Sequence, residues 1–131
     1  MSHGISDRTK LNYALGMLRV VKTTRVDPTN PTDDETAITG IVREWAIRGI
    51  EMGNAYTTRV GFGGTNEAYA KWRIEKWSER MADAVAIMWY EFEDRGIVVA
   101  DEMMNTIIDG IIALTKTMFE IVLDKDTIRG F

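Results

Sequence analysis

Residues 42–53 read VREWAIRGIEMG, a helix-like apolar face that runs into two glycines four residues apart. Glycine is common just after the last helical residue, so Gly49 is predicted to end the helix and Trp45 to anchor it in the core. Ile50 is then an apolar return toward the other helices, and Gly53 is a hinge at which an arm departs. The stretch is interpreted as a packing corner, not as a ligand-binding turn.

A helix, a loop and a second helix start are predicted before this corner. Ser6 can cap a helix that runs to about Val21, whose apolar residues recur at intervals of three and four: Leu11, Ala14, Leu15 and Leu18. Both prolines lie in the polar segment 24–35, which is typical of a loop. Thr32 and Glu35 can form a capping box, and the helix that follows is expected to bury one face: Ile38, Ile41, Val42 and Trp45.

An extended arm or hairpin is predicted over residues 54–66, where β-branched and aromatic residues give way to glycines at 61, 63 and 64. A GFGG run invites comparison with a phosphate-binding loop, because glycines let backbone N–H groups approach an anion. The run lacks the spacing and the lysine of a nucleotide-triphosphate loop. A mobile connector is the favoured interpretation.

Two longer helices are predicted in the second half of the chain. Residues 67–94 have apolar residues at alternating steps of three and four: Ala70, Ile74, Trp77, Met81, Ala84, Val85, Met88 and Phe92. At 1.5 Å per residue this helix is about 42 Å long, and Trp72, Trp77 and Trp89 cannot all face one stripe. A last helix, capped by Asp101, is expected to run to about Leu123. The surplus tryptophans suggest packing against a partner chain.

The length and composition indicate one soluble domain over residues 1–131. The predicted helices make this domain all-α, and a polar tail follows them at 124–131. No apolar run approaches the length of a membrane span and no signal-peptide pattern is present, so a cytosolic site of synthesis is expected. The net charge is −4, but residues 1–25 carry five basic side chains against one aspartate. Such a basic segment can touch an anion, although a solvated helix face explains it more simply.

Little in the sequence supports enzymatic chemistry, and no catalytic, metal-binding or cofactor-binding residue is assigned. The chain has no cysteine, and its one histidine, His3, lies in a terminal stretch. Among the carboxylates, Asp83 on the long helix, near aromatic residues, is the strongest candidate for an acid. A glycosidase would need two such groups at a fixed separation in a cleft. An enzyme therefore remains a minor alternative.

The order of these pieces carries a family resemblance. They read LNYALGML (11–18), DPTNPTDDE (27–35) and IVREWAIRGIEMG (41–53), followed by helices that begin at Glu67 and Asp101. In order, spacing and the W-x-x-x-G element, nearly the whole chain resembles the head-to-tail adaptor proteins of short-tailed bacteriophages. The resemblance implies an all-α, four-helix bundle-like adaptor with one long helix and an arm between the second and third helices. The C-terminal tail is short for the group.

The resemblance also implies a function and a set of partners. Such adaptors form a ring, here about a dozen copies, that sits under the portal protein, extends the DNA channel and holds a tail nozzle or hub protein in the virion. The tail residues would meet the portal: Asp126, Thr127, Ile128, Arg129 and Phe131. The arm residues Tyr56, Arg59 and Phe62 would meet a neighbouring subunit or a tail protein. Packaged DNA would pass through an acidic channel without specific binding.

A rival interpretation is a small terminase-like or other phage DNA-binding oligomer. It would use the basic N-terminal helix together with basic residues of the long helix: Lys71, Arg73, Lys76 and Arg80. Glu75 and Glu79 are interleaved with those residues, so a solvated face with pairs four residues apart explains them more economically.

Overall fold

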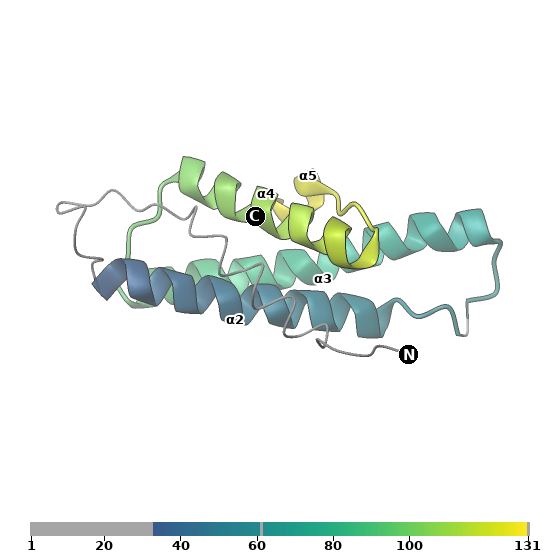
Figure 1. The fold of residues 1–131 in the computed structure, drawn as a ribbon, viewed down its shortest axis with the longest axis horizontal. Coiled ribbons are helices and arrows are strands. Elements are labelled where there is room, and N and C mark those ends of the chain that lie inside the picture. The colour runs from purple at the N-terminus through teal and green to yellow at the C-terminus, as the bar shows by residue number, and fades with distance from the viewer. Residues whose placement is uncertain (1–32, 61, 131) are drawn as a thin grey trace.

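The computed structural model describes residues 33–60 and 62–130, and this part of the chain is all-α, as predicted. It contains four helices, labelled as in Figure 1: α2 (Asp33–Tyr56), α3 (Asn66–Asp94), α4 (Asp101–Phe119) and α5 (Lys125–Ile128). No strand occurs in these residues. The predicted helix at 6–21, the Thr32 cap, His3, the basic segment 1–25 and Phe131 lie outside the described residues.

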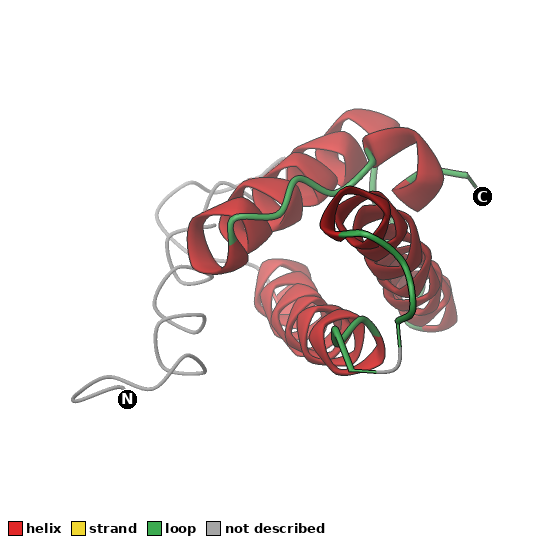
Figure 2. Cartoon of the chain, turned by 90° about the vertical axis from the view of Figure 1, so that its right-hand side faces the viewer, coloured by secondary structure: helices red, strands yellow, loops and turns green. Residues whose placement is uncertain are grey.

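The helices α2 and α3 form an antiparallel pair, and α4 packs along one side of it (Figure 1). Seen end on, α2, α3 and α4 lie at three corners around a common interior, with α5 beside α3 and α4 (Figure 2). The start of α3 extends beyond the other helices, so the α2–α3 connection lies at one end of an elongated molecule (Figure 1). None of the helices in the described part is long and apolar enough to cross a membrane.

One continuous core joins all four helices. Its largest fully buried side chains come from every helix and include Trp77 and Phe92 of α3. Six of the eight apolar positions predicted for the long helix are buried, whereas Ile74 is half-buried and Ala70 is exposed. The helix itself begins one residue before the predicted start, where the Thr65 hydroxyl accepts the Ala68 N–H at 3.1 Å.

The prediction that Gly49 ends the second helix is wrong, because α2 continues through both glycines to Tyr56. A side chain at Gly49 would place its Cβ 2.6 Å from Met81 Sδ, and one at Gly53 would overlap the Trp77 indole. Four residues apart, the two glycines share one face of the helix and let α2 and α3 approach closely. They are close-contact residues inside a helix, not a cap and a hinge.

The packing corner is thus a packing face, and the neighbouring assignments change with it. Ile50 is buried in the middle of α2, so it is not a return after a helix end. Trp45 does contribute to the core, but only as a half-buried side chain, with the Arg48 guanidinium 4.6 Å from its ring centroid. The predicted arm is correspondingly shorter, since only residues 57–65 lie between α2 and α3.

The last long helix ends earlier than predicted. Its N-cap is Ala100, with Asp101 as the first helical residue, and it stops at Phe119 because Glu120 adopts a left-handed conformation with φ of 57°. The turn lets Ile121 and Leu123 reach the core from an irregular segment. Gly96, with φ of +68°, makes the corresponding turn between α3 and α4.

The predicted polar tail is folded against the helices. Asp124 donates its backbone N–H to the buried hydroxyl of Ser78 at 2.8 Å, and α5 begins at the next residue. The ammonium of Lys125 lies 2.6 Å from the Asp109 carboxylate of α4. The tail is therefore joined to both α3 and α4.

Replacing Ser78 with alanine should lower the free energy of unfolding by about 1–3 kcal/mol, because the Asp124 N–H would lose its partner in a half-buried place. Thr117→Ala is the matched control: its hydroxyl bonds an exposed helix carbonyl, so the change should stay within about 0.5 kcal/mol. Urea unfolding followed by circular dichroism measures both. Equal effects would mean that the bond does not hold the tail.

Candidate interaction surface

Side chains that can recognise a partner gather at the end of the α2–α3 pair. Tyr56, the last residue of α2, is 60% exposed, and the Arg80 guanidinium lies 4.4 Å from its ring centroid. Val60, in the loop that follows, is 91% exposed. Arg59, which lies between Tyr56 and Val60 in the sequence, is also exposed. Tyrosine and arginine are among the residues most often found at the energetic centres of protein interfaces.

Arg59 organises the loop that carries these side chains. Its guanidinium donates to the carbonyl of Phe62 and, at 3.0 Å, to that of Gly64. The same group lies 5.5 Å from the Phe62 ring centroid and 5.2 Å from that of Tyr69. One side chain thereby closes the turn and covers two aromatic rings.

Three aromatic rings pack against one another beneath Arg59. The Phe62 centroid lies 5.5 Å from Tyr69 and 5.2 Å from Trp72, both on the first turns of α3. The Tyr69 hydroxyl donates to the Thr57 carbonyl, and the Thr57 hydroxyl donates to the Gly53 carbonyl at 2.6 Å. We call Arg59, Phe62, Tyr69 and Trp72 the aromatic corner. It gives the loop a defined shape.

The structure thus brings together the three arm residues that the sequence singled out, but in different roles. Tyr56 and Arg59 are exposed, whereas Phe62 is half-buried in the aromatic corner. A hollow of about 420 Å³ lies beside Tyr56, lined also by Trp72, Lys76, Glu79, Arg80 and Asp83. The surface therefore combines exposed apolar groups with charges of both signs.

Replacing Arg59 with alanine should loosen the loop without unfolding the helices, since its partners are two loop carbonyls and two ring faces. We expect hydrogen exchange of the amides of residues 57–65 to accelerate while the free energy of unfolding changes by about 1 kcal/mol or less. Arg59→Lys should not restore protection, because an ammonium cannot make the forked contact. Unchanged exchange in both variants would contradict this role.

The C-terminal residues assigned to a partner divide into exposed and buried ones. Ile128 is completely buried in the core of this chain, so in this fold it packs against the other helices and does not face a partner. The Thr127 hydroxyl donates to the Asp124 carboxylate at 2.6 Å. Asp126 of α5 and Arg129, the C-cap that follows it, are exposed. Among the described residues that the resemblance assigns to the portal, these two present a charged group to solvent.

The charges considered for rival functions are largely paired within α3. Lys76 lies 3.3 Å from Glu79, and Arg80 lies 4.0 Å from Asp83, which is exposed. Arg73 lies over Trp77 at 5.1 Å. Within the described ranges, no group of three or more histidine or carboxylate side chains is placed to hold a metal ion. These pairs form an interleaved helix face.

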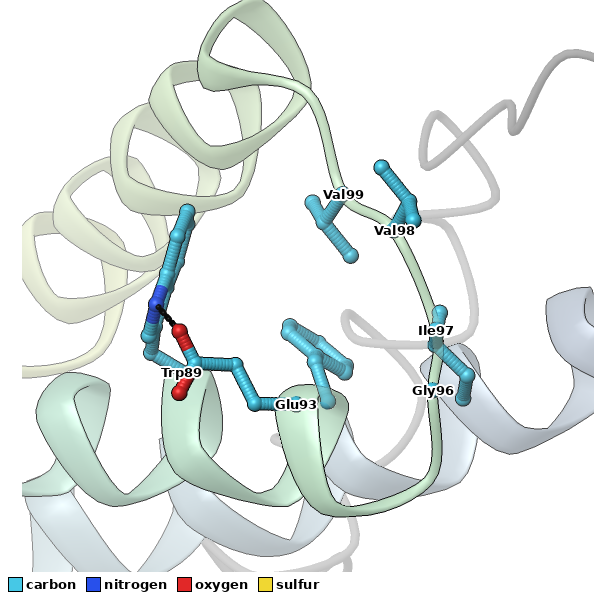
Figure 3. Close-up of a pocket in the computed structure, with 7 residues that line it drawn as sticks. Trp89, Glu93, Gly96, Ile97, Val98 and Val99 are labelled. Atoms are coloured by element: carbon cyan, nitrogen blue, oxygen red, sulfur yellow. Dashed lines mark hydrogen bonds between the residues drawn. The ribbon is translucent and has the colours of Figure 1, made fainter.

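A second hollow, which sequence reasoning missed, lies at the opposite end of the molecule. It measures about 310 Å³ and is formed by the end of α3 and the connection to α4: Trp89, Phe92, Glu93, Gly96, Ile97, Val98 and Val99. Trp89 donates its indole N–H to Glu93 at 2.8 Å on one wall, and Val99 faces the space from the other (Figure 3). Val98 is 93% exposed. In the sequence, the run of four apolar residues at 97–100 is the signal that could have indicated this hollow.

Comparisons of the chain with protein-family models, with curated protein sequences and with solved structures found no match.

Proposed function

We propose that the chain is a structural virion protein, a head-to-tail adaptor that assembles as a ring under the portal protein and offers an attachment site for tail proteins. One observation carries the proposal beyond the sequence resemblance. The arm residues that the resemblance assigns to subunit or tail contacts, Tyr56 and Arg59, are exposed at one end of the α2–α3 pair. A fixed aromatic and arginine surface suits recognition of a protein.

In this proposal the chain performs no catalysis and binds no cofactor. The fold is a four-helix bundle-like adaptor, and the exposed charges of the C-terminal tail, Asp126 and Arg129, face the portal. Acidic residues outnumber basic ones in the chain. An excess of negative charge is compatible with a channel through which DNA slides, because phosphate binding would hold the duplex.

Native mass spectrometry of the chain, alone and with its cognate portal protein, tests the proposal. A ring of copies on the portal is expected even if the free chain is monomeric. A chain that never binds portal would contradict the proposal. Retention on DNA that falls steeply with salt would instead favour the DNA-binding alternative.

The tail assignment has its own test. Asp126→Ala combined with Arg129→Ala should weaken portal binding about tenfold or more, while Arg43→Ala, an exposed change on α2, should not. The free energy of unfolding should be unchanged in both variants, since all three side chains are exposed. Portal binding that survives the double change would move the contact away from α5.

A further inference from the structure

The two ends of the molecule differ in charge, because carboxylates predominate at one end and both signs are mixed at the other. Along α3, the first half holds four basic residues interleaved with three acidic ones, whereas the second half, from Met81 to Asp94, holds four acidic residues and no basic one. The start of α2, the end of α3 and the start of α4 all lie at the same end (Figure 1). The carboxylate residues described at the end of α3 and the start of α4 define what we call the acidic end: Glu91, Glu93, Asp94, Asp101 and Glu102, with Arg95 as the basic residue among them.

The termini of α3 carry charges of both signs. The last turns of α3 hold Glu91, Glu93 and Asp94, and the C-cap residue that follows is the basic Arg95. At the opposite terminus Glu67 lies in the first turn, and the basic residues Lys71 and Arg73 follow further along the helix. Carboxylates therefore outnumber the one basic residue at the end of α3, whereas the start of the helix is mixed in charge.

Each end also exposes an apolar feature that complements the other. The acidic end holds the hollow of about 310 Å³ with exposed Val98 at its edge. The opposite end, which we call the arm end, presents Tyr56 and Val60 beside Arg59. A guanidinium has five N–H donors, so Arg59 keeps donors for an incoming carboxylate after its two bonds within the loop.

We propose that copies of this chain associate head to tail, the arm end of one copy docking on the acidic end of the next, with Tyr56 and Val60 against the Val98 hollow and Arg59 against its carboxylate rim. The second copy is the favoured occupant because charge and apolar surface are complementary on the same two patches. Contacts between unlike patches close into a ring or continue as a filament. The inference deepens the proposed adaptor function and rests on it for the ring.

Two surface variants test the pairing in the full chain. The arm variant combines Tyr56→Ser with Val60→Ser, and the end variant combines Asp94→Lys with Val98→Ser. Alone, each should weaken self-association about tenfold or more in sedimentation velocity. Mixed in equal amounts, they should form a one-to-one dimer that grows no further. The arm variant keeps an intact acidic end and the end variant keeps an intact arm end, so only one contact can form. Val122→Ser, an exposed valine outside both patches, is the control and should assemble like the unaltered chain.

The same variants separate this inference from the adaptor proposal. Self-association of the unaltered chain should weaken as salt is raised, since the interface pairs opposite charges. If rings form on the portal equally well with both variants, the head-to-tail contact is wrong while the adaptor function stands. If the end variant lowers thermal stability without changing assembly, the hollow is filled by the chain's own segment, which also overturns the proposal. The proposal is also overturned if the unaltered chain self-associates neither alone nor on the portal.

Discussion

Gly53→Ala should lower the free energy of unfolding by about 3 kcal/mol, although the same substitution usually stabilises a helix. The added methyl group would overlap the Trp77 indole, which is completely buried and has little room to move. Forcing extra volume into a packed core typically costs about 1–3 kcal/mol, and here it would separate α2 from α3. Thermal and urea unfolding followed by circular dichroism would measure the loss.

Gly40 provides a matched control in the same helix. It is exposed, and a Cβ there would meet no atom within 4 Å. Gly40→Ala should therefore raise the free energy of unfolding by about 0.5–1 kcal/mol through helix propensity alone. If both alanine variants were stabilised alike, the close contact between α2 and α3 would be disproved.

The identity of the obstructing group can be checked by a double-mutant cycle. In a Trp77→Leu background, which is itself destabilised by loss of the indole, Gly53→Ala should cost much less than in the unaltered chain. Gly49→Ala should have an intermediate effect, because the side chain it meets belongs to Met81, whose flexible thioether can move. Additive effects of the Gly53 and Trp77 changes would contradict direct contact.

Ile128→Ala should lower the free energy of unfolding by about 2–5 kcal/mol, the range for truncating a fully buried aliphatic side chain. Ile128 belongs to a four-residue helix that has little stability of its own, so its burial largely decides whether α5 stays docked. Arg129→Ala, one residue later and exposed, should change stability by less than about 0.5 kcal/mol.

This pair of substitutions decides between two roles for the C-terminal segment. If the segment were a free arm that docks only on a partner, Ile128→Ala would leave the isolated chain as stable as before and weaken partner binding alone. A loss of stability in the isolated chain, measured by urea unfolding, supports the docked arrangement. The structure favours the second outcome, because the Asp124 N–H also bonds the buried Ser78 hydroxyl.

Periodicity was enough to predict α3 to within one residue and most of its buried face. Its steps of three and four extend over the whole segment, and such a long pattern has few alternative interpretations. The end of α4 was harder to predict. Val122 continues the apolar spacing of α4 in the sequence, but it lies beyond the Glu120 turn and is half exposed. Nothing in a local pattern marks where tertiary packing makes a helix stop.

The candidate surface was predicted only as a set of residues. Tyr56, Arg59 and Phe62 stood out because aromatic and arginine residues occur in a glycine-rich segment. That Arg59 would bond two carbonyls of its own loop, and that Tyr69 and Trp72 would join Phe62, depends on how α3 returns past the loop. The hollow at Val98 was missed because its walls come from α3 and from the connection to α4.

The opening stretch VREWAIRGIEMG separates what sequence determined from what tertiary structure decided. Its apolar spacing determined a helix with one buried face, because that spacing repeats every turn whatever lies opposite. Whether Gly49 and Gly53 end the helix or continue it depends on what faces them, since glycine both stops a helix and allows another helix to approach. Met81 and Trp77, more than twenty residues further along the chain, decide the second outcome by occupying the space that a side chain would need.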